Sequence, residues 1–153
     1  MIIVTAEQLQ QIKTHAQFIY PNECCGLLLG HLTAKGSILI EVRETENSWT
    51  DELGEDLFTY SGTKRDRFYI APDVLLKIQK EARDRQLSII GVYHSHPDHL
   101  AIPSAMDQEI AWPEYSYLIV ALNSEEVVDL KCWKLDSTHQ FQSEEIVLTK
   151  IFE

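Results

Sequence analysis

The segment "GVYHSHPDHLAIPSAMDQEIAWP", Gly91 to Pro113, carries the strongest information on fold and chemistry in this sequence. It begins as an apolar run, reaches His94 and His96, and passes through a proline-containing loop to Ser104-x-x-Asp107. The stretch "LSIIGVYH", which leads into it, is apolar at successive positions. This pattern predicts a central strand with both faces buried. Ser104 fits the N-cap of a short helix that follows, with Asp107 at the third helical position.

The two histidines predict a metal site. Residues two apart in a strand project to the same side, so His94 and His96 aim their rings at one point, where Pro97 ends the strand. Neutral imidazole binds zinc, at about 2.0–2.1 Å, and a catalytic site needs a third ligand and an open position. Asp107 is the natural third ligand. The alternatives are a surface loop that happens to hold histidines and a helix cap made by Ser104 and Asp107, and the cap is compatible with metal binding.

The flanking sequence predicts a mixed α/β domain, of the α+β type, over 1–153. Thr5 and Gln8 fit a capping box that starts a helix with one apolar face. A second helix is expected to start at Pro72. Strands are expected over 24–30, 37–47, 87–94, 115–122 and 127–135, with a last strand within 140–152. Helices packed on a largely antiparallel sheet are therefore the expected architecture.

The middle of the chain has an unusual charge distribution. Residues 44–56 contain six acidic residues and no basic one. A solvated loop is one interpretation, and a loop that contacts a partner is the other. Trp49, Phe58 and Tyr60 favour the second, because a purely solvating loop does not need aromatic side chains.

Composition excludes some classes of partner. The chain has 153 residues, 44% hydrophobic, and a net charge of −11, so neither nucleic acid nor a membrane is an expected partner. The N-terminal sequence lacks the features of a signal peptide, and we expect a cytoplasmic protein. Cys24, Cys25 and Cys132 are too few and odd in number for a disulfide framework. They are interpreted as buried apolar residues, with a redox, metal or thiol-dependent role as the alternative.

Glu23 completes a longer pattern. It lies between the first helix and the buried strand, where a surface glutamate at a helix end is the simplest interpretation. Together with His94-x-His96, seven residues, Ser104, two residues and Asp107, however, it resembles the JAMM/MPN+ zinc metalloprotease family. "NECCGLLLG" and "GVYHSHP" are similar to its small prokaryotic single-domain members. The resemblance implies a curved β-sheet flanked by helices, in a cytidine-deaminase-like architecture.

The resemblance also implies a site and a reaction. His94, His96 and Asp107 would hold one Zn²⁺ per chain with a bound water. Glu23 would deprotonate that water, and Ser104 would orient the site and help to stabilise the oxyanion. The implied reaction is hydrolysis of a peptide or isopeptide bond.

The implied substrate is a ubiquitin-like or sulfur-carrier protein, cleaved next to its C-terminal Gly-Gly. Deubiquitinating members of the family carry two insertions that bind ubiquitin. Only eight residues separate Asp107 from Ser116, too few for the second insertion, whereas the 47–67 loop could take the place of the first. The acidic 44–56 segment could instead block the site.

Two other functions remain open from the sequence. One is a non-catalytic binding module that recognises ubiquitin-like tails, and the other is a thiol-dependent activity of Cys24 or Cys25. The sequence leaves the oligomeric state open. His99 is expected to be a solvated loop residue, and Trp112 is expected to pack beneath the site.

Overall fold

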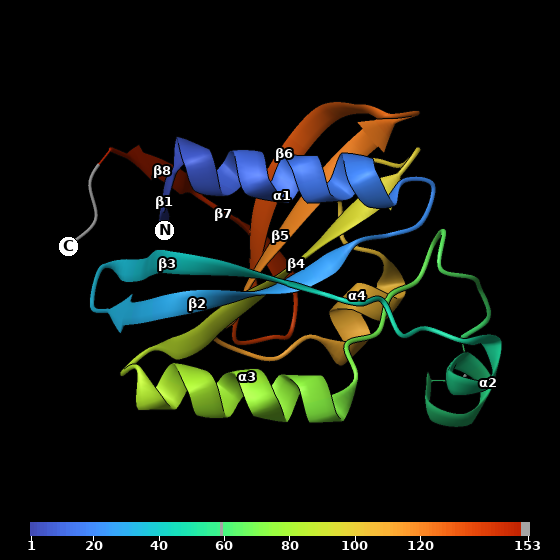
Figure 1. The fold of residues 1–153 in the computed structure, drawn as a ribbon, viewed down its shortest axis with the longest axis horizontal. Helices are drawn as coiled ribbons and strands as arrows, with labels where there is room; N and C mark the ends of the chain where they lie inside the picture. Colours follow the sequence, from blue (N-terminus) through green and yellow to red (C-terminus); the bar gives the residue numbers. More distant parts are fainter. Residues whose placement is uncertain (59, 151–153) are drawn as a thin grey trace.

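The structure is a computed structural model that describes residues 1–58 and 60–150. One eight-stranded sheet, in the order β7-β6-β5-β4-β2-β3-β1-β8, forms its centre and curves across the molecule (Figure 1). The strands are β1 Ile2–Thr5, β2 Cys25–Thr33, β3 Gly36–Thr45, β4 Ser88–Pro97, β5 Ser116–Asn123, β6 Glu126–Leu135, β7 Phe141–Glu144 and β8 Ile146–Thr149. The helical segments are α1 Ala6–Ile19, α2 Asp51–Leu53, the π-helical η1 Gly54–Phe58, α3 Pro72–Asp84 and α4 Ala105–Ile110.

The expectation of a largely antiparallel sheet flanked by helices is confirmed. Among the described strands, four of the seven pairings are antiparallel: β2–β3, β2–β4, β5–β6 and β6–β7. The β1–β3, β1–β8 and β4–β5 pairings are parallel. A parallel pair cannot be joined by a tight turn, so the chain between β4 and β5 has to cross over. That crossover contains α4.

Helix α1 begins at the predicted cap. The Thr5 side chain accepts a hydrogen bond from the Gln8 amide at 3.1 Å, and the Gln8 side chain accepts one from the Thr5 amide at 2.9 Å. Ile12 and Ala16 are buried on its inner face. Both therefore add to the core that α1 covers.

The two long helices cover opposite faces of the sheet, as Figure 1 shows for α1 and α3. Leu28 of β2 packs in the same cluster as Ile12 of α1, whereas its neighbours Leu27 and Leu29 pack with Ile78 of α3. Side chains alternate between the faces of a strand, so one strand contributes to both cores. Both faces of β2 are buried, which accounts for its unbroken apolar sequence.

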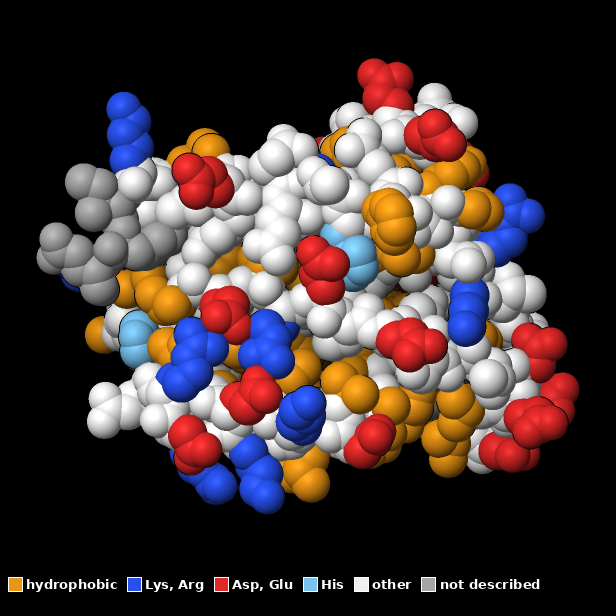
Figure 2. Space-filling model, viewed as in Figure 1, with side chains coloured by type: hydrophobic (Ala, Val, Ile, Leu, Met, Phe, Trp, Pro, Cys, Tyr) orange, Lys and Arg blue, Asp and Glu red, His pale blue; other side chains and the backbone are white. Residues whose placement is uncertain are grey.

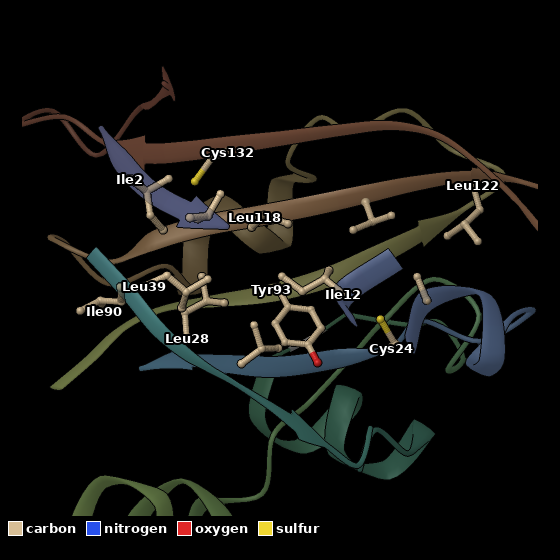
Figure 3. Close-up of a cluster of buried hydrophobic side chains, with 14 residues drawn as sticks. Ile2, Ile12, Cys24, Leu28, Leu39, Ile90, Tyr93, Leu118, Leu122 and Cys132 are labelled. Atoms are coloured by element: carbon tan, nitrogen blue, oxygen red, sulfur yellow. The ribbon is translucent and has the colours of Figure 1, made fainter. Parts of the chain in front are cut away.

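The larger core lies between α1 and the sheet. Figure 3 shows the ring of Tyr93 directed into the same cluster as Ile12 and Leu28. Tyr93 is fully buried, and its hydroxyl lies 2.8 Å from Nδ1 of His15. Burying one such apolar side chain contributes about 1.5–3 kcal/mol, so this cluster holds β4 firmly where the strand approaches the histidines.

The structure corrects three expectations about secondary structure. β1, a strand before α1, was not predicted, and it pairs with both β3 and β8. In place of the single last strand expected within 140–152, the chain forms two short strands, β7 and β8. Residues 151 and 152 of that range lie outside the residues that the structure describes. The acidic segment is partly helical at α2 and η1 rather than an irregular loop.

Charges are distributed unevenly over the face seen in Figure 2. Lys and Arg side chains alternate with Asp and Glu over α3, whereas acidic side chains gather at the right-hand edge over α2. The ion pairs Arg43–Glu81 (2.7 Å) and Arg85–Glu41 (3.0 Å) join the C-terminal end of α3 to β3. Among residues 1–58 and 60–150, no helix combines the length and apolar character needed to span a bilayer.

Candidate metal centre

The carboxyl end of β4 and the first turn of α4 bring three potential ligands together. His94 Nε2 lies 3.1 Å from His96 Nε2 and 3.3 Å from Asp107 Oδ2, and His96 Nε2 lies 3.4 Å from that oxygen. All three ligand atoms lie within 4.8 Å of one another. His94 and His96 are buried, and Asp107 is half-buried. Two imidazole nitrogens and one carboxylate oxygen are a donor set typical of zinc.

Local structure explains why Asp107 points at the histidines. Ser104 caps α4: its Oγ accepts from the Asp107 amide at 3.0 Å, and Asp107 Oδ2 accepts from the Ser104 amide at 2.9 Å. This capping box fixes the carboxylate at the helix N-terminus, where the helix dipole favours an anion. The cap and the ligand position therefore coexist in one residue.

The two imidazole rings are oriented in different ways. His96 Nδ1 lies 2.7 Å from the Leu100 carbonyl oxygen, which can only accept, so Nδ1 carries the proton and Nε2 presents its lone pair. The His94 ring instead stacks on Phe68, with centroids 4.4 Å apart and an interplanar angle of 23°. His94 Nδ1 is buried, with no hydrogen-bond partner among the residues that the structure describes. Stacking therefore replaces the hydrogen bond that usually orients a ligating histidine.

Ionisation states favour a cation at this point. Burial lowers the pKa of His94, so its ring is neutral at pH 7. Burial opposes ionisation of Asp107, but His94, His96 and the Ser104 amide hold its pKa well below its usual range. An anionic oxygen thus faces the neutral ring of His94, and a bound cation fits that set of atoms.

Glu23 lies beside this cluster, in the same cleft. It is only 4% exposed, and burial, with smaller contributions from Asp107 and Asp66, raises its pKa well above its usual range, while Arg67 partly offsets this. Its backbone amide donates to the Lys64 carbonyl at 2.7 Å. The cleft has a volume of about 510 Å³ and is lined by Glu23, Asp66, Arg67, His96, His99, Leu100, Ile102 and Ser104.

The rim of the cleft is partly apolar. Leu100 is 72% exposed and Ile102 is 49% exposed. His99 is exposed, in agreement with its interpretation as a loop residue. Trp112 is 69% exposed, so the expectation that it packs beneath the site is wrong. Among the described residues, the lining includes none from the acidic 44–56 segment.

Two remote segments hold α4 in place. The hydroxyl of Tyr60 donates to the Glu109 carboxylate, and Nε2 of His139 donates to the Gln108 carbonyl oxygen at 2.7 Å. A helix of six residues has little stability by itself. These contacts therefore contribute to the position of Asp107.

The cysteines are poorly placed for nucleophilic chemistry. Cys24 and Cys25 are fully buried and unpaired, and burial raises the pKa of each thiol to about 12. Thiolate, the reactive form, is scarce at neutral pH under these conditions. Cys132 is also buried, and it contacts Glu144 at 3.4 Å.

Sequence reasoning missed two residues that support the site. Phe68 was assigned no role, and Asn47 was named only as a boundary of the 47–67 loop. Asn47 is buried and contacts the backbone of both Glu23 and Arg67. Neither residue belongs to a local pattern, so no signal in the sequence identifies it.

Comparison with known proteins gives a family match. The family described as "Prokaryotic homologs of the JAB domain" matches residues 5–136. A desampylase of Haloferax volcanii is 29% identical over 100 residues, which span 65% of this chain and 62% of that protein. A desampylase of Pyrococcus furiosus is 27% identical over 128 residues, which span 82% of this chain and 76% of that protein.

Solved structures share the fold. A solution structure of a Desulfitobacterium hafniense protein has a TM-score of 0.80 and 29% identity, and the match covers 100% of this chain and 96% of that one. The crystal structure of a JAB1/MPN domain protein from Archaeoglobus fulgidus has a TM-score of 0.56 at 18% identity, covering 98% of this chain and 100% of that one. At that identity the second likeness concerns the fold alone.

Proposed function

The chain belongs to the family of prokaryotic homologues of the JAB domain, and from that premise we propose that it is a zinc-dependent isopeptidase or peptidase. The proposal rests on one observation: two imidazole nitrogens and a carboxylate oxygen lie within 4.8 Å of one another, beside a buried glutamate. The substrate that we propose is a ubiquitin-like or sulfur-carrier protein. The bond cleaved would follow its C-terminal Gly-Gly.

His94, His96 and Asp107 would hold the metal. Three protein ligands would leave a fourth coordination position for water or substrate, as a catalytic rather than a structural zinc requires. When bound, zinc supplies a Lewis acid that lowers the pKa of water to about 7 and polarises a carbonyl group. The chain's own residues then have to move protons and orient the substrate.

Glu23 would act as the general base and then as the general acid. It is buried at the entrance to β2 and shares the cleft with His96 and Ser104. A carboxylate there can take a proton from the attacking water and pass it to the leaving amine. Burial raises the pKa of this carboxyl above its usual range, towards values at which one group can both accept and release a proton.

Ser104 would stabilise the oxyanion. Its Oγ uses a lone pair to accept from the Asp107 amide at 3.0 Å, and a hydroxyl has one donor in addition to two acceptor sites. Since Ser104 lines the cleft, the remaining O–H can donate to a carbonyl oxygen as it gains charge. The residue thus caps α4 and faces the reaction.

The shape of the cleft supports an extended tail as substrate. Leu100 and Ile102 form an exposed apolar wall next to His96, whereas Asp66 and Arg67 provide polar groups in the same cleft. Apolar side chains of an extended peptide can pack on this wall, while Asp66 and Arg67 can pair with its polar groups. The relatives that are named desampylases support the same substrate class.

A paired substitution tests the proposal. The substrate would be a ubiquitin-like carrier protein extended past Gly-Gly, with bound zinc measured by metal analysis. We expect Glu23→Gln to keep zinc and to lose about 10²–10⁴-fold in cleavage rate. His94→Ala should lose both zinc and cleavage, and the exposed Glu7→Gln should change neither. Wild-type cleavage by Glu23→Gln would overturn the mechanism, and carrier binding without zinc or turnover would identify a binding module instead.

A further inference from the structure

Asn47 makes four hydrogen bonds from a buried position between β3 and α2. Its Nδ2 donates to the carbonyl oxygens of Glu23 and Arg67, each at 3.0 Å. Its Oδ1 accepts from the amides of Trp49 at 3.1 Å and Tyr69 at 3.2 Å. A carboxamide has two N–H donors and one oxygen with two lone pairs, so every site is used. A fully satisfied buried group of this kind holds its partners in one arrangement.

The partners of Asn47 lead to both sides of the candidate metal centre. On one side, Asn47 holds the carbonyl of Glu23, the proposed base. On the other, it holds Arg67 and Tyr69, the residues on either side of Phe68, whose ring stacks on His94 at 4.4 Å. Because His94 Nδ1 has no hydrogen-bond partner among the described residues, the stacked ring is the contact that orients it.

From these contacts we infer that Asn47 is a positioning residue for the reaction. It joins the backbone of Glu23 to the segment that carries Phe68, and so sets the base and the His94 ring at a fixed separation. The inference rests on the proposed function for the role of Glu23. Its effect on His94 is independent of catalysis and can be measured on the metal alone.

Substitutions of Asn47 separate positioning from folding. Asn47→Asp keeps an oxygen that accepts from Trp49 and Tyr69 but loses both donations, so the link from Glu23 to Arg67 through Asn47 is lost. The hydrogen bond from the Glu23 amide to the Lys64 carbonyl remains. Misplacement by about 1 Å can cost about 10²-fold in rate. For this variant we expect kcat to fall by about 10–100-fold with KM little changed, since the side chains of Leu100 and Ile102, the apolar wall of the cleft, are unchanged.

A spectroscopic measurement tests the part of the inference that concerns His94, which Asn47 would position through Phe68. Co²⁺ would be bound to the protein and its visible absorption recorded, because the absorption depends on how the ligands are arranged. We expect Asn47→Asp and Phe68→Leu each to bind one Co²⁺, with a changed spectrum and weaker affinity. Asn123→Asp, the same exchange at the exposed end of β5, should leave the spectrum, the affinity and kcat unchanged.

The outcomes distinguish this inference from the proposed function. If wild-type protein does not cleave, the proposed function fails, and the cobalt spectra still decide whether Asn47 positions His94. Wild-type kcat and an unchanged cobalt spectrum in folded Asn47→Asp would overturn the inference. Should that variant not fold, Asn47→Ser is measured in the same way. A wild-type cobalt spectrum in Phe68→Leu would by itself overturn the inference that the Phe68 ring positions His94.

Discussion

Replacing Asp107 with asparagine should abolish the stabilisation of the protein by zinc while leaving the metal-free fold intact. Asp107 Oδ2 has two functions in the structure: it accepts from the Ser104 amide at 2.9 Å, and it faces both imidazole nitrogens. The amide oxygen of asparagine can still accept from Ser104. Its neutral oxygen is a much weaker ligand for a divalent cation than a carboxylate.

The size of the effect follows from linkage between binding and folding. A ligand that binds only the folded state at 100 times its Kd adds about 2.7 kcal/mol to the free energy of unfolding. In a chain of this size, 1 kcal/mol raises Tm by about 2–4 °C, so zinc should raise Tm of the wild-type protein by roughly 5–10 °C. Asp107→Asn should show almost no increase at the same zinc concentration.

For each variant, thermal unfolding is followed by circular dichroism with zinc and again with a chelator. The difference between the two Tm values measures the zinc effect on that variant alone. Asp66→Asn is the matched control: Asp66 lines the same cleft, but its Oδ1 accepts from the Thr63 amide at 2.8 Å and it is not part of the three-ligand cluster. We expect this control to keep the full zinc effect. A full zinc effect in Asp107→Asn, or its loss in Asp66→Asn, would refute the assignment of the third ligand.

Three further predictions concern the core, the pH dependence and the thiols. Leu28→Ala should lower the free energy of unfolding by about 2–5 kcal/mol in urea titrations, because a fully buried side chain leaves a cavity, while zinc still binds. Burial lowers the pKa of His15, with Glu44 opposing, so the unfolded chain takes up the proton first and stability falls as pH drops below about 6.5. His15→Gln should flatten the plot of unfolding free energy against pH between about 7.5 and 5.5, and an unchanged slope would contradict this. Replacing Cys24 and Cys25 together with alanine should leave the rate of cleavage per folded molecule at its wild-type value, whereas a large loss would favour thiol chemistry.

Local patterns explain what could be predicted from the sequence. The α1 capping box and the cap at Ser104 each depend on residues three apart, and both are present in the structure. The convergence of His94 and His96 follows from the period of a strand. Asp107 was expected as the third ligand because it lies in the first turn of the next helix, although its final place depends on how the β4–β5 crossover folds.

Long-range contacts explain what could not be predicted. β1 has only four residues, and its partners β3 and β8 lie far along the chain, so nothing near it distinguishes a strand from the start of a helix. Asn47 and Phe68 act through contacts with residues that fold next to them. Trp112 was expected to pack beneath the site, but it follows the end of the short helix α4 and is exposed.

The contacts of Tyr60 and His139 with α4 have a practical consequence for redesign of the protein. Glu109 is 49 positions from Tyr60, and Gln108 is 31 positions from His139. The position of Asp107, the third ligand, therefore depends on parts of the chain outside the cleft. A library that varies the cleft to change substrate preference should keep both side chains constant. Varying them would alter metal loading and selectivity together, and the two effects would be hard to separate in a screen.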